Sequence, residues 1–226
     1  MSAPSSPNLP RKKTVFLVDD HPLVREWLTN LINQQPDLEV CGEAESGPEA
    51  MQAILSLKPD IAIVDIALKD SSGIELIKDL KQSSPDVAVL VLSMHEESHY
   101  AERALRAGAR GYLMKRETTR KVIAAIHKVL AGELSISEGI AAGMAAKFVA
   151  GKALMTGSPV EQLSDRELEV FELLGQGRGT RQIAEVLRVS VKTVQAYCAR
   201  IKEKLNLASA TELVREAVRW CERRHS

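Results

Sequence analysis

The sequence predicts an α/β fold, a doubly wound five-stranded parallel sheet, followed by a second, smaller all-α domain. Five short runs of strand-forming residues alternate with five helical patterns over about 120 residues, which is typical of a parallel sheet with right-handed helical crossovers. The run Ile61–Asp65 is apolar up to its last residue, as expected for a central strand that is buried on both faces. From Leu163 onward the patterns are only helical, which indicates a separate domain.

The predicted strands and helices of the first domain follow from the period of their apolar residues. Strands are expected at 14–18, 38–44, 61–65, 87–92 and 111–114, where β-branched and other apolar residues cluster. Helices are expected between them and after the last strand, because apolar residues there recur every three or four positions. These residues are Val24, Trp27, Leu28, Leu31 and Ile32; Ala50, Ala53, Ile54 and Leu57; Ile74, Ile77 and Leu80; Ala101, Ala104 and Leu105; and Val122, Ile123, Ile126, Val129 and Leu130.

Length and composition fit an ordinary globular protein of one large or two small domains. The 226 residues carry equal numbers of basic and acidic side chains, 30 of each, so net charge indicates no class of partner. Three cysteines without close spacing favour a reducing cytoplasm over a disulfide scaffold or zinc site. No segment is apolar enough for a membrane span. The expected division is a disordered leader at 1–12, the α/β domain at 13–131, a partly helical linker at 132–160, and the helical domain at 161–226.

Polar residues follow four of the predicted strands. Asp19 and Asp20 follow the first strand, Asp65 ends the third, Ser93 follows the fourth, and Lys115 follows the fifth. Because the carboxyl ends of parallel strands meet at one edge of a sheet, these side chains are expected to lie together. Clustered carboxylates repel each other and any incoming anion, so chemistry on an anion at this edge requires a divalent cation, for which Mg²⁺ is suited.

The set Val18-Asp19-Asp20-His21, Asp65, Gly73, Ser93 and Gly111–Lys115 resembles the flavodoxin-like receiver domain of bacterial two-component response regulators. The resemblance implies that a sensor histidine kinase phosphorylates Asp65. It also implies that Asp19, Asp20, Asp65 and the backbone carbonyl of Ala67 hold Mg²⁺. Ser93 and Lys115 would bind the phosphoryl oxygens, and Tyr112 would turn inward as a switch.

Two departures from the receiver pattern affect loop behaviour. Leu68-Lys69 stands where the family commonly has Met-Pro, and Arg116 follows Lys115.

Ala67 and His95 stand two residues beyond Asp65 and Ser93, where they flank the phosphoryl group. Ala67 cannot orient a hydrolytic water, so slow self-dephosphorylation is expected unless His95 orients it.

The sequence of the second domain predicts a series of short helices. Ser164 and Glu167 form a capping-box pattern, Thr180 is placed to cap a short helix, and Val189-Ser190 is expected to form a turn before a longer helix. From Arg188 to Lys204 the only acidic residue is Glu203, which suits a helix that faces DNA, although a solvated charged face would look similar.

Leu163–Val170, Gln182-Ile183-Ala184, Ser190–Val194 and Lys204-Leu205 resemble the LuxR-type helix-turn-helix of the NarL/FixJ response regulators. The resemblance implies that Gln195, Ala196 and Ala199 face bases; the first and third positions are often lysine in that family, and Tyr197 stands where histidine is usual. Gln and Ala still permit base readout. Phosphate contacts are expected from Arg181, Lys192, Thr193, Arg200 and Lys202, and a last helix at 209–224 would help to form a homodimer.

The sequence therefore predicts a cytoplasmic response regulator that is no turnover enzyme. Its expected partners are a sensor histidine kinase, double-stranded promoter DNA and a second copy of the chain, with RNA polymerase as a further candidate. Three alternatives stay open: an aspartyl-phosphate phosphatase, disfavoured by the absence of a second acid two residues after Asp65; an adaptor whose helical domain binds protein; and a DNA-binding regulator that works without phosphorylation.

Overall fold

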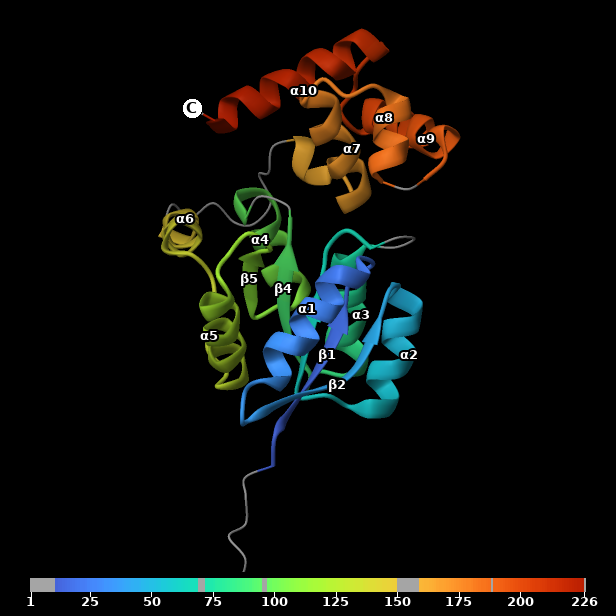
Figure 1. The fold of residues 1–226 in the computed structure, drawn as a ribbon. Coiled ribbons are helices and arrows are strands. Elements are labelled where there is room, and N and C mark those ends of the chain that lie inside the picture. The colour runs from blue at the N-terminus through green and yellow to red at the C-terminus, as the bar shows by residue number, and fades with distance from the viewer. Residues whose placement is uncertain (1–10, 69–71, 95–96, 150–158, 188, 226) are drawn as a thin grey trace, which may run out of the picture. The chain divides into compact units, whose positions relative to one another are not determined.

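The computed structural model describes residues 11–68, 72–94, 97–149, 159–187 and 189–225. The chain divides into two compact units, Met1–Met144 and Ala145–Ser226 (Figure 1). The first unit contains the predicted alternation of strands and helices, and the second is helical, so the predicted fold class is confirmed.

The elements of the first unit agree closely with the sequence pattern. Its strands differ from the predicted ranges by one residue at most at each end. The strands are β1 (Lys13–Val18), β2 (Leu38–Ala44), β3 (Ile61–Val64), β4 (Ala88–Ser93) and β5 (Gly111–Met114). The helices are α1 (Pro22–Asn33), α2 (Gly47–Leu57), α3 (Gly73–Ser83), α4 (Glu97–Ala107) and α5 (Thr119–Leu130), followed by α6 (Glu138–Val149).

The five strands form one parallel sheet in the order β2-β1-β3-β4-β5. The chain leaves β1 toward one edge and returns to pair β3 with the other side of β1, so the order reverses between these two strands. Val18 pairs with Val64, and Ser93 with Met114, so β1, β3, β4 and β5 end side by side. Ligands of open α/β sheets bind where the strand order reverses, at the carboxyl ends of the strands.

Helices cover both faces of the sheet. Alternate residues of β1, β3 and β4 share one buried cluster with residues of α1 and α5, including Leu17, Ile63, Leu90, Leu28 and Ile126. The intervening strand residues point to the opposite face, where α2, α3 and α4 lie in succession, with α2 against β1 and β2 and α4 against β5 (Figure 1). Burial on both faces explains why β3 is apolar throughout.

The segment after α5 covers the edge of the sheet at β5. Ser135 forms a parallel bridge with Gly111, its amide donates to the Arg110 carbonyl (2.9 Å), and its carbonyl accepts from the Tyr112 amide (2.9 Å). A Cβ on Gly111 would lie 3.0 Å from the Ser135 carbonyl oxygen and 2.7 Å from Leu90 Cδ1. The small residue therefore lets the segment approach, which protects an otherwise open edge strand.

The second unit contains four helices after a short 3₁₀ turn at Pro159–Gln162: α7 (Asp165–Gly175), α8 (Thr180–Val186), α9 (Val191–Lys204) and α10 (Ala210–His225). Phe171 of α7 meets Trp220 of α10 edge to face, with ring centroids 5.7 Å apart. A Cβ on Gly175 would lie 2.5 Å from the Ala217 carbonyl oxygen, so α7 and α10 cross closely there. α10 thus covers the core of this small unit.

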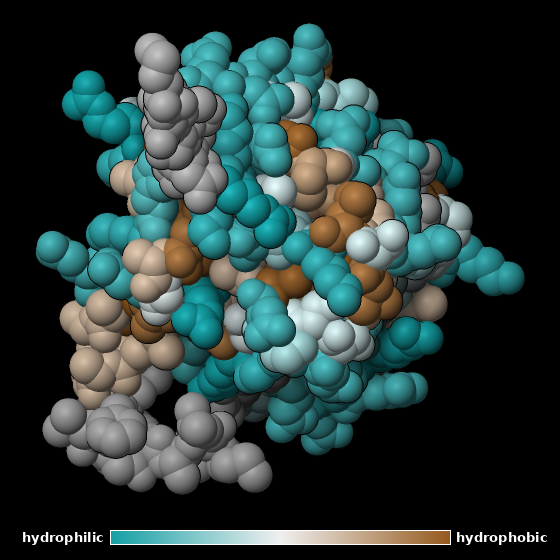
Figure 2. Space-filling view, turned by 90° about the horizontal axis from the view of Figure 1, so that it is seen from below, coloured by the Kyte–Doolittle hydropathy of each residue, from teal (hydrophilic) through white to brown (hydrophobic). Residues whose placement is uncertain are grey.

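The face of the molecule seen from below in Figure 1 is mainly hydrophilic (Figure 2). In the view from below Figure 1, hydrophobic residues show only as small, separate patches (Figure 2). Among the described residues, the helices are all too short or too polar to cross a membrane.

Gly73 provides a test of the loop after β3. Its amide donates to the Ile66 carbonyl (2.8 Å), and a Cβ there would lie 2.0 Å from the Asp65 carbonyl oxygen. Because backbone must move to make room, we expect Gly73→Ala to lower the free energy of unfolding by about 2 kcal/mol or more in urea titrations. Gly143→Ala is the control, since no atom lies within 4 Å of its Cβ position and alanine favours helix. Equal stability of the two variants would contradict the close packing at Gly73.

Candidate functional site

The structure brings the predicted strand-end residues together. Asp19, Asp20, Asp65 and Ser93 are all nearly inaccessible to solvent, with exposed fractions of 3%, 7%, 3% and 0%. The Asp65 amide donates to the Val18 carbonyl (2.8 Å) and the Lys115 amide to the Ser93 carbonyl (2.8 Å), which continues the sheet pairing into the site. The site is therefore positioned by the backbone of the sheet itself.

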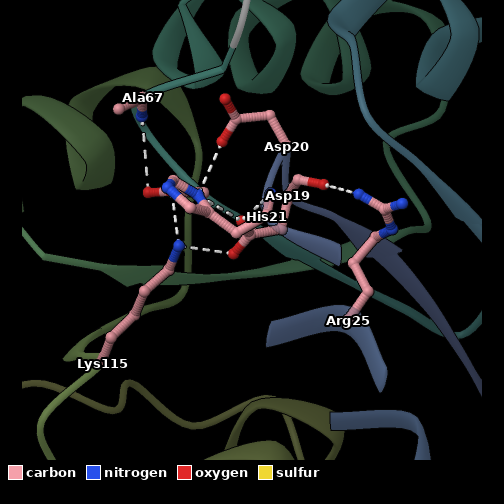
Figure 3. A network of polar contacts seen from close by, with 7 residues as sticks. Asp19, Asp20, His21, Arg25, Ala67 and Lys115 are labelled. Atoms are coloured by element: carbon pink, nitrogen blue, oxygen red, sulfur yellow. Dashed lines mark hydrogen bonds and ion pairs between the residues drawn. The ribbon is translucent and has the colours of Figure 1, made fainter. Parts of the chain in front are cut away.

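Lys115 reaches across from the end of β5 to two carboxylates. Its Nζ lies 2.6 Å from Asp65 Oδ2 and 2.5 Å from Asp19 Oδ2 (Figure 3). The Ser93 hydroxyl hydrogen-bonds to the same Asp65 carboxylate. Lys115 and Ser93 thus stand next to the oxygen atoms of Asp65, as a phosphoryl group on that residue would require.

Two residues that the sequence analysis did not assign also belong to the site. The His21 Nδ1 lies 2.7 Å from Asp20 Oδ1 and 3.1 Å from Asp19 Oδ1. Arg25 approaches from the side opposite Lys115 and donates to the backbone carbonyl of Asp19 (2.6 Å; Figure 3). The signals were available, because His21 directly follows the paired acids and Arg25 lies one helical turn beyond it.

Burial and neighbouring charges shift the pKa values of Asp65 and Lys115. Burial raises the pKa of Asp65 and nearby Asp19 raises it further, against the opposing effect of Lys115 and Ser93. Burial by itself would lower the pKa of Lys115, but Asp65 and Asp19 together hold it above its usual value. Asp65 therefore binds its proton more tightly mainly because it is buried, and Lys115 does so because two carboxylates surround its ammonium group.

The donor set fits a divalent cation. Three carboxylates and one ammonium group leave two formal negative charges in a buried cluster, and Asp19, Asp20, His21 and Asp65 each offer a ligand atom within 4.8 Å of the others. Ala67 lies beside them, and its amide faces Asp65 Oδ1 (3.4 Å). Ligation by its carbonyl stays a prediction. Lys69 and His95, named above for the adjoining loops, lie outside the described residues.

The side chain of Tyr112, the predicted switch residue, is buried in this structure. Its exposed fraction is 1%, and Tyr100 of α4, which the sequence analysis did not single out, is fully buried. An inward turn of Tyr112 is therefore not required from this conformation.

α9 gathers most of the predicted DNA-facing residues on one surface. Val194 and Ile201 are buried and fix the inner face of the helix. Lys192, Gln195, Ala196, Ala199 and Arg200 are exposed, at the spacing of one helical face, while Thr193 and Lys202 are half-buried and Arg181 is exposed on α8. Residue 188 lies outside the described part.

Of the helix N-caps predicted in the second unit, some are confirmed and one is wrong. The predicted capping box of α7 is confirmed, with the Ser164 amide donating to Glu167 Oε2 (2.7 Å) and the Glu167 amide to Ser164 Oγ (3.4 Å). At α9, Ser190 is the N-cap and its Oγ accepts from the Thr193 amide (3.0 Å). The proposed cap at Thr180 was wrong, because the helix begins with Thr180 and Gly179 precedes it as the N-cap.

Lys204 has a structural role in the helical unit. Its Nζ lies 2.6 Å from Glu167 Oε2 and donates to the Gln162 carbonyl (3.3 Å). Burial tends to raise the pKa of Glu167, but hydrogen bonds from Lys204 and Ser164 outweigh this and lower it. Lys204 therefore joins α9 to α7, which explains its place in the sequence pattern without a contact to DNA.

Comparison with known proteins matches both units to described families. Residues 15–127 match "Response regulator receiver domain", and residues 161–217 match "Bacterial regulatory proteins, luxR family". The chain is 36% identical over 209 residues to "Oxygen regulatory protein NreC" of Staphylococcus carnosus, covering 91% of this chain and 96% of that protein.

Solved structures show the same architecture. A two-component response regulator of the LuxR family from Aurantimonas sp. is similar with a TM-score of 0.57 and 35% identity, over 61% of this chain and 99% of that one. RcsB from Salmonella enterica, solved bound to a promoter in the presence of a phosphomimetic, shares the fold with a TM-score of 0.57 and 24% identity, over 91% of this chain and 98% of that one.

The crowded carboxylates predict that Asp65→Asn stabilises the metal-free protein. The change removes one of the mutually repelling charges, and Lys115 keeps Asp19 as its partner. We expect the free energy of unfolding in EDTA to rise by about 1 kcal/mol, measured by urea titration. Asp60→Asn is the control of opposite sign, because burial raises the pKa of Asp60 but hydrogen bonds from Lys13 and Thr14 outweigh this and lower it. A less stable Asp65→Asn protein would argue against charge crowding.

Proposed function

Because this chain belongs to the two-component response regulators with a receiver domain and a LuxR-type helix-turn-helix domain, we propose that a sensor histidine kinase phosphorylates Asp65 and thereby controls dimerisation and binding to promoter DNA. The observation that carries the proposal is the convergence of Asp65, Lys115 and the paired acids at the end of the sheet. We assign residues 13–131 to the receiver, 132–160 to the linker and 161–226 to the DNA-binding domain, acting in the cytoplasm.

At the receiver, a carboxylate oxygen of Asp65 attacks the phosphorus of a phosphohistidine. The new O–P bond replaces the P–N bond, and the imidazole leaves. Asp19, Asp20, Asp65 and the Ala67 carbonyl would hold Mg²⁺, which would offset the repulsion between the carboxylates and the phosphate. Lys115 already contacts Asp65, so its ammonium group can pass to a phosphoryl oxygen without leaving Asp19. Each transfer modifies one molecule of the protein, so the protein is regulated by the reaction and does not turn over a substrate.

The signal then passes to elements that touch the site. Ser93 ends β4, α4 begins at Glu97, and Tyr112 of β5 lies three residues before Lys115. A change in the partner of the Ser93 hydroxyl acts at the end of β4, so we propose that α4 and β5 carry the phosphorylation state to the rest of the chain.

At the DNA, the exposed face of α9 enters the major groove. Gln195, Ala196 and Ala199 face the bases, with Gln suited to adenine and Ala to a thymine methyl group. Arg181, Lys192, Thr193, Arg200 and Lys202 contact phosphates. The missing lysines at positions 195 and 199 imply weaker binding per subunit, which a dimer compensates. Val214 of α10 is 42% exposed, and it offers a dimer contact.

We expect donor-dependent selection of DNA. Purified protein mixed with a genome-derived DNA library, Mg²⁺ and a small phosphodonor should enrich a two-fold site several-fold more strongly than without donor, because phosphorylation favours the dimer. Asp65→Asn should lose the donor effect and Lys115→Met should reduce it. Enrichment that ignores both donor and Asp65 would instead support the phosphorylation-independent alternative, and no enrichment at all would support the adaptor.

Salt titrations of DNA affinity should distinguish residues that contact phosphates from residues that contact bases. Lys192→Ala and Arg200→Ala should weaken binding to all sequences and each lower the slope of log affinity against log salt by about 1. Gln195→Ala should leave the slope unchanged and cost about 1–3 kcal/mol of base discrimination at one position. Lys121→Ala is the control, because Lys121 pairs with Glu117 in the receiver. Identical slopes for all four proteins would remove α9 from the interface.

A further inference from the structure

Residues 132–137, called the strap below, run along β5 after α5 has ended. The Ser135 amide donates to the Arg110 carbonyl (2.9 Å), and the Ser135 carbonyl accepts from the Tyr112 amide (2.9 Å). These two bonds form the parallel bridge to β5 described above. The strap therefore pairs with the edge strand of the sheet at one residue only.

The other end of the strap is held by α4. The Ser137 amide donates to Glu97 Oε1 (2.9 Å), and Glu97 is the first residue of that helix. A hydrogen bond to a carboxylate is stronger than one between neutral groups, but it is lost when the two atoms move apart by less than 1 Å. Ser93, whose hydroxyl contacts Asp65, lies only four residues before Glu97. The carboxylate that holds the strap is thus close along the chain to a group that would meet the phosphoryl oxygens.

The strap buries little surface of its own. Ser135 is 8% exposed and Ile136 is half-buried, but Leu134 is 60% exposed and Ser137 is also exposed. A cavity of about 280 Å³ lies among the strap, α4, β5 and α5, so the strap is not closely packed on the helix beside it. Segments with few buried apolar contacts open more readily than the sheet beneath them. The strap can therefore leave β5 while the sheet stays folded.

The end of the strap is also the start of α6. The Ser137 carbonyl accepts from the Ala141 amide (3.1 Å), and the Ile140 amide donates to Ser137 Oγ (3.3 Å). Ser137 thus caps the first turn of α6 while its own amide is held by Glu97. Because one residue joins α4 to the linker helix, loss of the Glu97 contact frees the start of that helix.

We propose that the strap is closed in the unphosphorylated protein and is released when phosphorylation of Asp65 displaces the start of α4. The proposal rests on the proposed function, and it names the element that passes the signal from α4 and β5 to the linker. In the released state Glu97 no longer accepts from the Ser137 amide, β5 loses its pairing with Ser135, and the first turn of α6 is free to move.

Amide hydrogen exchange in the full-length protein tests the release. Peptides that cover 110–114 and 132–141 are followed by mass spectrometry with and without acetyl phosphate and Mg²⁺, and the intact mass measures phosphorylation of Asp65. We expect phosphorylation to raise the exchange rates of the Tyr112 and Ser135 amides about tenfold, and those of the β3 amides less than about twofold. Asp65→Asn should show no response to the donor.

Two variants test the contact with α4 in the absence of donor. Glu97→Gln keeps the size of the side chain and an acceptor oxygen but removes the charge that strengthens the bond to Ser137, so exchange in the strap should rise about fivefold. Glu102→Gln is the matched control, because Glu102 lies on the same helix and pairs with Arg106 there. It should leave exchange in the strap unchanged. Thermal melting verifies the fold of both variants.

The outcomes separate the release of the strap from the function on which it rests. Equal exchange in Glu97→Gln and Glu102→Gln would overturn the role of Glu97 as the residue that holds the strap. If the donor phosphorylates Asp65 but exchange in the strap is unchanged or slower, the release is wrong and the proposed function stands. If the donor leaves Asp65 unmodified, the proposed function fails and the release fails with it.

Discussion

The contact of Lys115 with Asp19 and Asp65 is the interaction around which the site of the first unit is arranged. Burying three carboxylates at one edge of a sheet is costly, and a single ammonium group offsets only part of their charge. A bound cation would offset the remaining negative charge. The sheet supplies the rigidity that holds these groups together, since β1, β3, β4 and β5 are paired up to the residues that bear them.

β5 connects this site to the segment that leads toward the second unit. Lys115 follows the strand at its carboxyl end, and Ser135 pairs with its free edge through Arg110 and Tyr112. Glu97 at the start of α4 accepts from the Ser137 amide (2.9 Å), so the same segment also contacts α4. A cavity of about 280 Å³ lies among α4, β5, α5 and this segment. The elements next to the acidic site are thus the ones that hold the start of the linker.

The helical unit divides its charges between structure and surface. Glu167 and Lys204 pair at the junction of α7 and α9, while Arg166 pairs with the buried Glu169 (2.7 Å). The exposed face of α9 retains Lys192 and Arg200. This arrangement lets a unit with a small core bury acidic residues, each with a partner, and still present a basic face.

The sequence by itself determined the alternation of strands and helices, the convergence of Asp19, Asp20, Asp65, Ser93 and Lys115, and the surface formed by α9. These features follow from local periodicity and from the fact that parallel strands end at one edge. Only the tertiary structure decided which acidic side chain each basic side chain contacts. In it, His21 lies beside Asp20 and Lys204 pairs with Glu167, while Tyr112 is buried and Val214 is exposed. Such pairings depend on side-chain positions across elements distant in sequence, and a pattern along one chain does not encode those positions directly.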